Sequence, residues 1–193
     1  MSNFLANATR VGRIMVGGKA YTGKEHVRYQ HALVCDWDNN FPNELRRRHV
    51  SLVYIFVVDG VIKKIGQSSC GTGISGCLAF YMKAGQDNPG PNRFSINHLI
   101  RSELEKERNV EVYMIYMEPI TISMPSLTGE RQVVVPVSAK GIEDNCLEEY
   151  RSFHQGRNPD WNFQENGESI PQNITDDYNE YRTLRAAGSA KNV

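Results

Sequence analysis

Long apolar runs, paired cysteines and an excess of charge of either sign are all missing from this 193-residue sequence. No stretch approaches the roughly 20 apolar residues that span a bilayer, and the opening residues, MSNFLANATRVGRIMVGGK, lack the unbroken apolar core of a secretory signal. These absences predict a soluble, intracellular protein of the cytoplasm. Because 22 basic residues balance 22 acidic residues, the overall charge gives no support for a nucleic-acid partner, and only local clusters of charge can do so.

The four cysteines form neither a CxxC pair nor a disulfide-dense framework. Free thiols in a reducing compartment are therefore expected. Cys70 and Cys77 could be combined with His98 into a zinc site, but their spacing matches no zinc motif.

The length and the 40% apolar content suit one domain of ordinary size. Residues 1–50 carry eight basic and four acidic residues, a net charge of +4, and are predicted to form an N-terminal arm and basic connector. Within them, residues 8–35 mix glycines and aromatics without a clear period, which fits a short hairpin or an irregular arm, and residues 42–49 fit a short helix. Residues 164–193 are polar, with five acids against three bases, and predict an extended or disordered arm.

The segment between these ends, residues 51–163, is predicted to be the core. SLVYIFVV, then Asp59-Gly60, then VIKKIG is a strand, turn and strand signature. Helical patterns follow at 74–85, 93–108 and 140–155, with an alternating strand at 109–117 and an inserted β-hairpin at about 119–136. The pattern predicts an α/β (α+β) fold with a small, mostly antiparallel sheet flanked by helices.

Tyr54 lies in the first strand of the predicted hairpin, and two lysines lie in the second. A two-residue turn would place Tyr54 opposite Ile65 with Lys63 on its side, whereas a three-residue loop would place it opposite Lys64. Either way a lysine shares the face of the tyrosine, at a cross-strand Cβ distance of roughly 5 Å. A cation that close would lower the pKa of the phenol and make it a proton acceptor. The alternative is a packing tyrosine beside solvated lysines.

These residues carry a resemblance to a known family. LVYIFVVDGVIKKIGQSS resembles the paired motif that names the GIY-YIG nucleases, with Val53-Tyr54-Ile55 as the first block and Lys64-Ile65-Gly66 as the second. The lysine in place of the second tyrosine is similar to the compact GIY-YIG type II restriction endonucleases. SAKGIEDNCLEEYRSF is similar to the late helix that bears the metal-binding glutamate, here Glu143, and RNPDWN matches a Pro-x-x-Asn element that ends at Asn162. The resemblance covers roughly residues 50–162.

The resemblance implies a Mg²⁺- or Mn²⁺-dependent endonuclease that cuts double-stranded DNA, of the restriction or phage-defence type. It implies catalytic roles for Tyr54, Lys64, Tyr81 and Glu143, with Glu143 as the metal ligand. A carboxylate is a suitable hard-oxygen ligand for Mg²⁺. The alternatives are that Glu143 is an acid favoured by the helix dipole and that Tyr81 only packs.

One element of the family pattern is missing. The resemblance places an arginine about four residues before Tyr81, but Gly76 and Cys77 stand there, and no arginine occurs between Lys64 and Arg93. Neither residue can clamp a phosphate as a guanidinium does. Either Arg93 or Arg101 reaches in from the next helix, or Lys83 substitutes, or the protein binds DNA without cutting it well. A non-cutting DNA-binding or regulatory protein is therefore the alternative function, and a protein-binding domain is a third.

Contacts to DNA are expected from basic and amide side chains outside the core motif. The cluster Arg46-Arg47-Arg48 precedes the first core strand and could neutralise several phosphates. The tip of the inserted hairpin carries residues whose donor geometry suits base edges. The predicted DNA-binding residues are Arg46, Arg47, Arg48, Arg93, Arg131, Gln132 and Asn162. A two-fold symmetric DNA sequence would call for a homodimer, with the terminal arms as candidate contacts.

Overall fold

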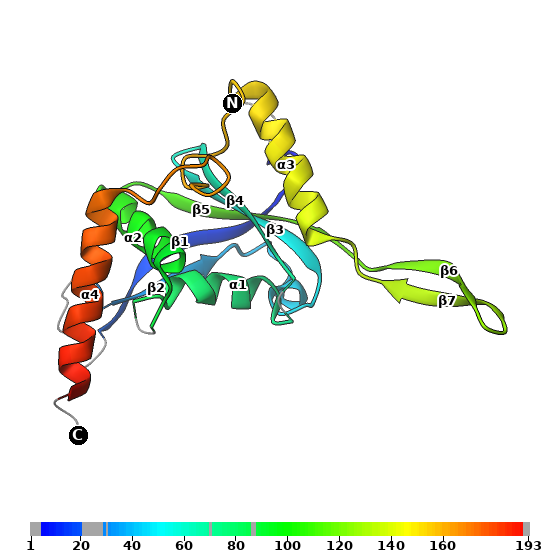
Figure 1. Cartoon of the computed structure of the whole chain (residues 1–193), viewed down its shortest axis with the longest axis horizontal. Coiled ribbons are helices and arrows are strands. Elements are labelled where there is room, and N and C mark those ends of the chain that lie inside the picture. The colour runs from blue at the N-terminus through cyan, green and yellow to red at the C-terminus, as the bar shows by residue number, and fades with distance from the viewer. Residues whose placement is uncertain (1–4, 21–28, 30, 70, 86–87, 191–193) are drawn as a thin grey trace.

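The computed structural model describes residues 5–20, 29, 31–69, 71–85 and 88–190 (Figure 1). Five strands form one antiparallel sheet in the order β2-β1-β5-β3-β4, and β6 and β7 form a separate hairpin. The elements are β1 (Thr9–Ala20), β2 (His31–Trp37), η3 (Asn43–Arg46), β3 (Ser51–Val58), β4 (Val61–Ser68), α1 (Gly73–Met82), α2 (Pro91–Glu105), β5 (Val110–Met117), β6 (Ile120–Ser126), β7 (Gly129–Val135), α3 (Ala139–Phe153) and α4 (Gln172–Ala190). The predicted fold class, an antiparallel sheet flanked by helices, is confirmed. Within the described residues, no helix is both long and apolar enough to cross a membrane.

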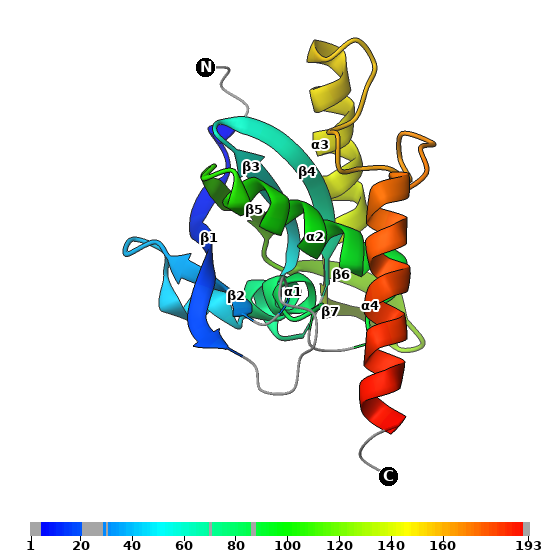
Figure 2. The same ribbon diagram turned by 90° about the vertical axis from the view of Figure 1, so that its left-hand side faces the viewer.

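Strand β3 is the centre of the fold, and all eight of its residues are buried. Because side chains alternate along a strand, β3 supplies two cores. Tyr54 and Phe56 pack on one face with α1 and α2, whereas Val53 and Ile55 pack on the other face with α3. Figure 2 shows α1 and α2 inside the curve of the sheet and α3 outside it. The active-site candidates therefore come from elements on both sides of β3.

Residues 9–20 and 31–37 form two strands of the central sheet and not an arm, which corrects the predicted boundary of the core. Of the two structures expected for residues 8–35, the hairpin is the one observed: β1 pairs with β2 on one side and with β5 on the other. The register of β1 shifts between Arg10 and Gly12 against β5 and between Val16 and Ala20 against β2. Each shift interrupts the two-residue alternation by which a strand is recognised in a sequence.

The prediction that residues 164–193 form an extended or disordered arm is wrong for residues 172–190, which form α4. This helix packs on α2 through Ile174 and Tyr181, which join Phe94 in a third hydrophobic cluster. Tyr178 lies on the same face, and its hydroxyl donates to the carbonyl oxygen of Pro89 at 2.9 Å. The spacing i, i+4, i+7 is helical, but two of these three residues are tyrosines in a polar stretch.

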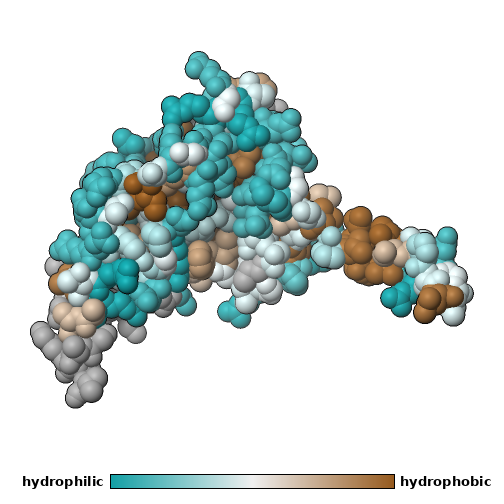
Figure 3. Space-filling model, viewed as in Figure 1, coloured by the Kyte–Doolittle hydropathy of each residue, from teal (hydrophilic) through white to brown (hydrophobic). Residues whose placement is uncertain are grey.

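The β6–β7 hairpin extends away from the rest of the molecule (Figure 1). Paired residues share a face, so the hairpin has one apolar face and one largely polar face. The apolar face carries Ile120, Ile122, Met124, Val133, Val135 and, near the tip, Arg131; the other carries Thr121, Ser123, Pro125, Glu130, Gln132 and Val134. Figure 3 shows apolar side chains gathered on this projection.

Replacing residues 120–135 by a short Gly-Ser linker is expected to leave the stability of the core unchanged within about 1 kcal/mol. The reason is that every residue of β6 is exposed and that an isolated two-stranded hairpin adds little stability in water. Urea unfolding followed by circular dichroism measures this. A clear fall in the unfolding midpoint would show that the hairpin docks on the core.

Candidate active site

The register of the β3–β4 hairpin decides which side chains meet. Asp59 and Gly60 have φ angles of 46° and 81°, the positive values of a two-residue turn that matches strand twist. Val58 accordingly pairs with Val61, but the register then shifts, so that Tyr54 pairs with Gly66. Of the two turns considered from the sequence, the two-residue form is the one observed, and the predicted partner of Tyr54 is corrected from Ile65 or Lys64 to Gly66.

The register shift falls at Lys63. Its carbonyl oxygen accepts a hydrogen bond from the Trp161 backbone N–H at 2.8 Å, and its ammonium lies 2.6 Å from Asp160. Lys64 pairs with Phe56 and therefore lies on the face that carries Tyr54. The expectation that one lysine shares the face of the tyrosine is confirmed for Lys64.

Gly66 makes room for the Tyr54 ring. A Cβ atom at position 66 would lie 2.3 Å from the Tyr54 hydroxyl oxygen and 2.4 Å from its Cζ atom. Because glycine has no side chain, the ring crosses the edge strand at this point, and the Tyr54 hydroxyl lies 2.6 Å from the hydroxyl of Tyr81 on α1. The two phenols thus share one short hydrogen bond.

Burial controls the protonation of this pair. Desolvation is the largest cause that raises the pKa of Tyr54 well above its usual 10.0, with Tyr81, Cys77 and Glu143 adding to it. Desolvation also raises the pKa of Tyr81 to about 12, although its hydrogen bond with Tyr54 acts in the opposite direction. The predicted lowering of the pKa of Tyr54 by a lysine is therefore wrong, because desolvation of the phenolate outweighs any attraction to a cation. Desolvation also lowers the pKa of Lys64. At neutral pH the phenols keep their protons, while the ammonium of Lys64 releases its proton more readily than an exposed lysine does.

Glu143 lies in the first half of α3, which begins after the N-cap Ser138; the side chain of Ser138 accepts a hydrogen bond from the Gly141 N–H. Glu143 is only 6% exposed, and its Oε2 atom lies 3.2 Å from the ammonium of Lys140. Its charge acts on both phenols and on Lys64, since it raises the pKa of all three groups.

The four predicted catalytic residues come from β3, β4, α1 and α3, and the charge of Glu143 acts on the other three, two of which are hydrogen-bonded to each other.

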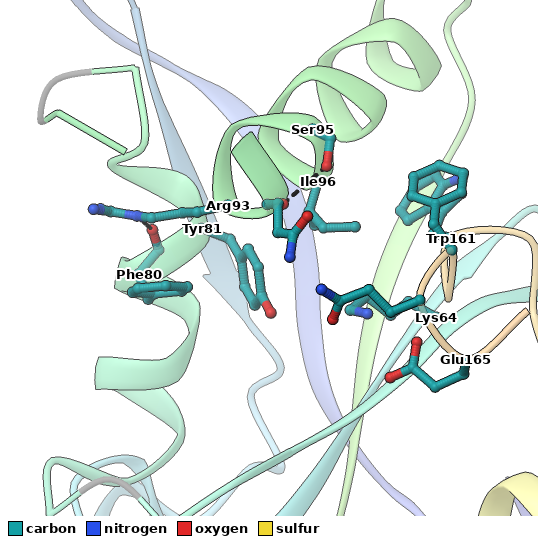
Figure 4. Close-up of a pocket in the computed structure, with 11 residues that line it drawn as sticks. Lys64, Phe80, Tyr81, Arg93, Ser95, Ile96, Trp161 and Glu165 are labelled. Carbon is teal, nitrogen blue, oxygen red and sulfur yellow. Dashed lines mark hydrogen bonds between the residues drawn. The ribbon is translucent and has the colours of Figure 1, made fainter. Parts of the chain in front are cut away.

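A cavity of about 250 Å³ opens beside this cluster, and both Lys64 and Tyr81 line it. Figure 4 shows Tyr81 on one side of the cavity and Lys64, Trp161 and Glu165 on the other. Tyr54 and Glu143 are not among the lining residues. Glu165 was not predicted from the sequence, because it lies in the polar segment assigned to the C-terminal arm; its charge acts on Lys64 and Tyr81.

The candidates for the missing arginine differ in position. Cys77 is buried one helical turn before Tyr81. Arg101 is also buried, and its guanidinium donates to the Asn97 side chain and to the carbonyl oxygen of His31 at 2.7 Å, so it is a structural residue. Arg93 lines the cavity; it donates to the carbonyl oxygen of Phe80 and lies over the Phe80 ring at 4.6 Å. Lys83 is exposed and does not line the cavity. Among the described residues that line the cavity, Arg93 is thus the one arginine.

The basic cluster before β3 is divided in the structure. Arg46 lies over the Trp37 ring at 4.5 Å and is partly buried. Arg47 and Arg48 are exposed, and Arg48 pairs with Glu118 at 3.1 Å. Arg47 and Arg48 are therefore the members of the cluster that are best placed to meet a phosphate.

One DNA-contact prediction requires correction. Arg131 and Gln132 are exposed and lie on opposite faces of β7, and their contact with DNA stays a prediction. Asn162 is fully buried; its Oδ1 atom accepts from the Ile65 N–H at 3.0 Å, and its Nδ2 atom donates to the Ile65 carbonyl oxygen at 2.7 Å. Asn162 holds its loop against β4 and is unavailable to DNA.

The donor set limits which metal could bind. Among the described residues, no group of three or more His, Cys, Asp and Glu side chains could hold a metal ion, and Cys70 of the considered zinc site lies outside the described residues. His98 lies 3.2 Å from both Tyr29 and Asp177. The single carboxylate of Glu143 fits Mg²⁺, which keeps several waters and needs one or two protein carboxylates. The Lys140 side chain is 60% exposed and can leave Glu143 when a cation binds.

Comparisons with known proteins give low similarity. No family model matches the sequence, and no curated protein matches it. Among solved structures, a mutant of bacteriophage T4 EndoII is similar over 80% of this chain and 91% of its own, with a TM-score of 0.46 and 15% identity. The restriction endonuclease HPY188I in complex with product DNA is similar over 81% of this chain and 80% of its own, with a TM-score of 0.39 and 20% identity. At these TM-scores neither similarity bears on the site or the substrate of this chain.

The protein is expected to lose stability as the pH rises above 10. A phenol whose pKa is raised by folding keeps its proton in the folded state after the unfolded chain has lost it. Its contribution to the free energy of unfolding is therefore complete below pH 10 and disappears as the pH rises to the pKa of the folded state. For Tyr81, with a pKa of about 12, each pH unit in this window costs about 1.4 kcal/mol. Urea unfolding between pH 9 and 11.5 measures the slope. Tyr54→Phe and Tyr81→Phe should flatten it, and an unchanged slope in both variants would contradict the expectation.

Proposed function

We propose that this protein is a metal-dependent endonuclease that hydrolyses phosphodiester bonds of double-stranded DNA, of the restriction or phage-defence type and with a GIY-YIG-like site. The observation that carries the proposal is the cluster in which two hydrogen-bonded phenols, a buried carboxylate and a lysine with a lowered pKa lie beside an open cavity. A packing role explains none of the three polar features, because burying an ionisable group has a cost in free energy.

The phenols can act as hydrogen-bond donors to the phosphate. One hydroxyl of the Tyr54–Tyr81 pair donates to the other, which leaves the second proton for an external acceptor such as a phosphate oxygen. Because the pKa of both phenols is raised, neither is the proton acceptor at neutral pH. Lys64 lines the cavity, and burial lowers the pKa of its ammonium, so in this proposal its neutral amine would take a proton from the attacking water.

The negative charge of the phosphate would be balanced by a metal ion held by Glu143 and by the guanidinium of Arg93. Glu143 would hold Mg²⁺ or Mn²⁺, which supplies positive charge to the phosphate when bound. Arg93 lines the cavity and presents the guanidinium that the sequence lacks on α1. A homodimer would offer two such sites to a two-fold symmetric DNA sequence.

The test is incubation of the purified protein with supercoiled and linear DNA in Mg²⁺ or Mn²⁺, with a chelator as control. Metal-dependent cleavage is expected. Salt-dependent binding without cleavage in either metal would contradict the proposal and support the non-cutting DNA-binding protein, which the absence of an arginine at Gly76 and Cys77 favours. No affinity for DNA even at low salt would point to a protein-binding domain.

A further inference from the structure

The cavity beside Tyr81 and Lys64 has more aromatic surface than a phosphate site needs. A phosphate is recognised by cations and hydrogen-bond donors, yet Phe80, Tyr81, Trp161 and Phe163 all line this space. Phe80 is 52% exposed, although burying a phenylalanine side chain stabilises a protein. An exposed ring in the wall of a cavity is a surface on which a planar ligand can stack.

Arg93 extends this aromatic wall. Its guanidinium lies 4.6 Å from the centre of the Phe80 ring, and its Nε atom donates to the carbonyl oxygen of Phe80, which fixes the orientation of the plane. Figure 4 shows Arg93 and Phe80 at one end of the cavity and Trp161 at the other. A ligand between these ends would lie against the flat Arg93–Phe80 pair on one side, and Trp161, which is only 5% exposed, closes the other end.

The polar groups of the cavity suit the edge of a ring that carries both donors and acceptors. Asn92 and Gln164 line it, and within the described part of the chain neither side-chain amide has a hydrogen-bond partner. An amide offers a donor and an acceptor side by side, which matches the exocyclic groups and ring nitrogens of a nucleobase. Glu165 adds a second acceptor.

The size of the cavity points to one ring system. Its volume of about 250 Å³ falls below the roughly 300–1,000 Å³ of sites for drug-sized molecules. The ligand must also reach Tyr81 and Lys64, which line the same space. A base that is attached to the phosphate cut at this site meets both conditions.

We propose that this cavity binds one nucleobase that has left the base stack of the DNA. The base stacks on the Phe80 ring, and the side chains of Gln164 and Asn92 bind its edge. This inference rests on the proposed function, because the base is placed by the phosphate next to it. A base inside a duplex is inaccessible, so the DNA must extrude it, at a cost that stacking and edge contacts offset.

The first experiment needs no cleavage. The four deoxynucleoside monophosphates and deoxyribose 5-phosphate are titrated into the full chain without metal. At least one nucleotide is expected to bind more tightly than the sugar phosphate. Phe80→Ala should lower that affinity about 5- to 150-fold, the range that corresponds to base–aromatic stacking, and Gln164→Ala should change which base is preferred. Phe153→Ala is the matched control, since Phe153 is 69% exposed and lies outside the cavity. Equal affinity for all five ligands would overturn the inference.

The second experiment identifies the source of the base. Duplexes that carry 2-aminopurine at successive positions are mixed with Glu143→Gln protein in chelator, and fluorescence reports unstacking. A rise at one position that Phe80→Ala removes supports an extruded base. Nucleotide binding without a rise at any position would indicate a free-nucleotide site and overturn extrusion. If cleavage occurs but neither experiment shows base binding, the proposed function stands and this inference falls. If bases bind and no DNA is cut, the proposed nuclease activity fails instead.

Discussion

Glu143→Gln is expected to lower metal-dependent DNA cleavage by about 10²- to 10³-fold or more, the range seen when one electrostatic contribution to a transition state is removed. Glu143 is the carboxylate whose charge reaches both phenols and Lys64, and glutamine keeps its size while losing the charge that would hold a divalent cation. Initial rates of plasmid cleavage in saturating Mg²⁺ measure the effect.

The fold should survive this substitution. The salt bridge that Glu143 makes with Lys140 involves a side chain that is 60% exposed, and such pairs contribute no more than about 1 kcal/mol. The matched control is Glu148→Gln, an exposed acid on the same helix, which should cut at the wild-type rate. Cleavage by Glu143→Gln within about twofold of wild type, with the fold intact, would rule Glu143 out as the metal ligand.

Gly66→Ala is expected to lower both stability and DNA cleavage, because Gly66 in β4 lies opposite Tyr54 in β3. The new Cβ atom would lie 2.3 Å from the hydroxyl oxygen of Tyr54 and 2.4 Å from Cζ, well inside the roughly 3.5–4.0 Å of a favourable contact. The ring cannot move away freely, because Tyr54 is 5% exposed and packs against Phe56 and Tyr81. Overpacking of this kind costs about 1–3 kcal/mol of stability, and the displaced hydroxyl would lose its bond to Tyr81.

A double-mutant cycle isolates this clash. In a Tyr54→Ala background the ring is absent, so Gly66→Ala should destabilise the protein by much less than it does in the wild type. Gly71→Ala is the control, since a Cβ there would meet nothing within 4 Å, and it should leave both the unfolding midpoint and cleavage unchanged. Full activity of Gly66→Ala would show that the position of the Tyr54 hydroxyl is unimportant.

Local patterns in the sequence were sufficient for the elements around the site. The Asp59-Gly60 turn, the helical spacing of α2 and α3, and the projecting hairpin are each specified by neighbouring residues, and all are present in the structure. Alternation along the strands placed one of the two lysines on the face of Tyr54, but for the two-residue turn it indicated Lys63, and the register shift puts Lys64 there instead.

Features that depend on contacts between distant residues were not predictable. The register shift at Lys63 is accompanied by a backbone hydrogen bond from Trp161, almost a hundred positions later. The direction of the pKa shift of Tyr54 follows from burial by elements on both sides of it, which the charge of a neighbouring lysine could not reveal. Glu165 reaches the cavity only because the loop before it is attached to β4.

The attachment of that loop also affects how the molecule behaves in concentrated solution. Strand β4 ends the sheet, and a free sheet margin can recruit strands from other molecules and start aggregation. The Asn162 amide bonds both the N–H and the carbonyl oxygen of Ile65, so these two groups cannot pair with a strand from another molecule. Changes at Asn162 would then show themselves as precipitation and self-association.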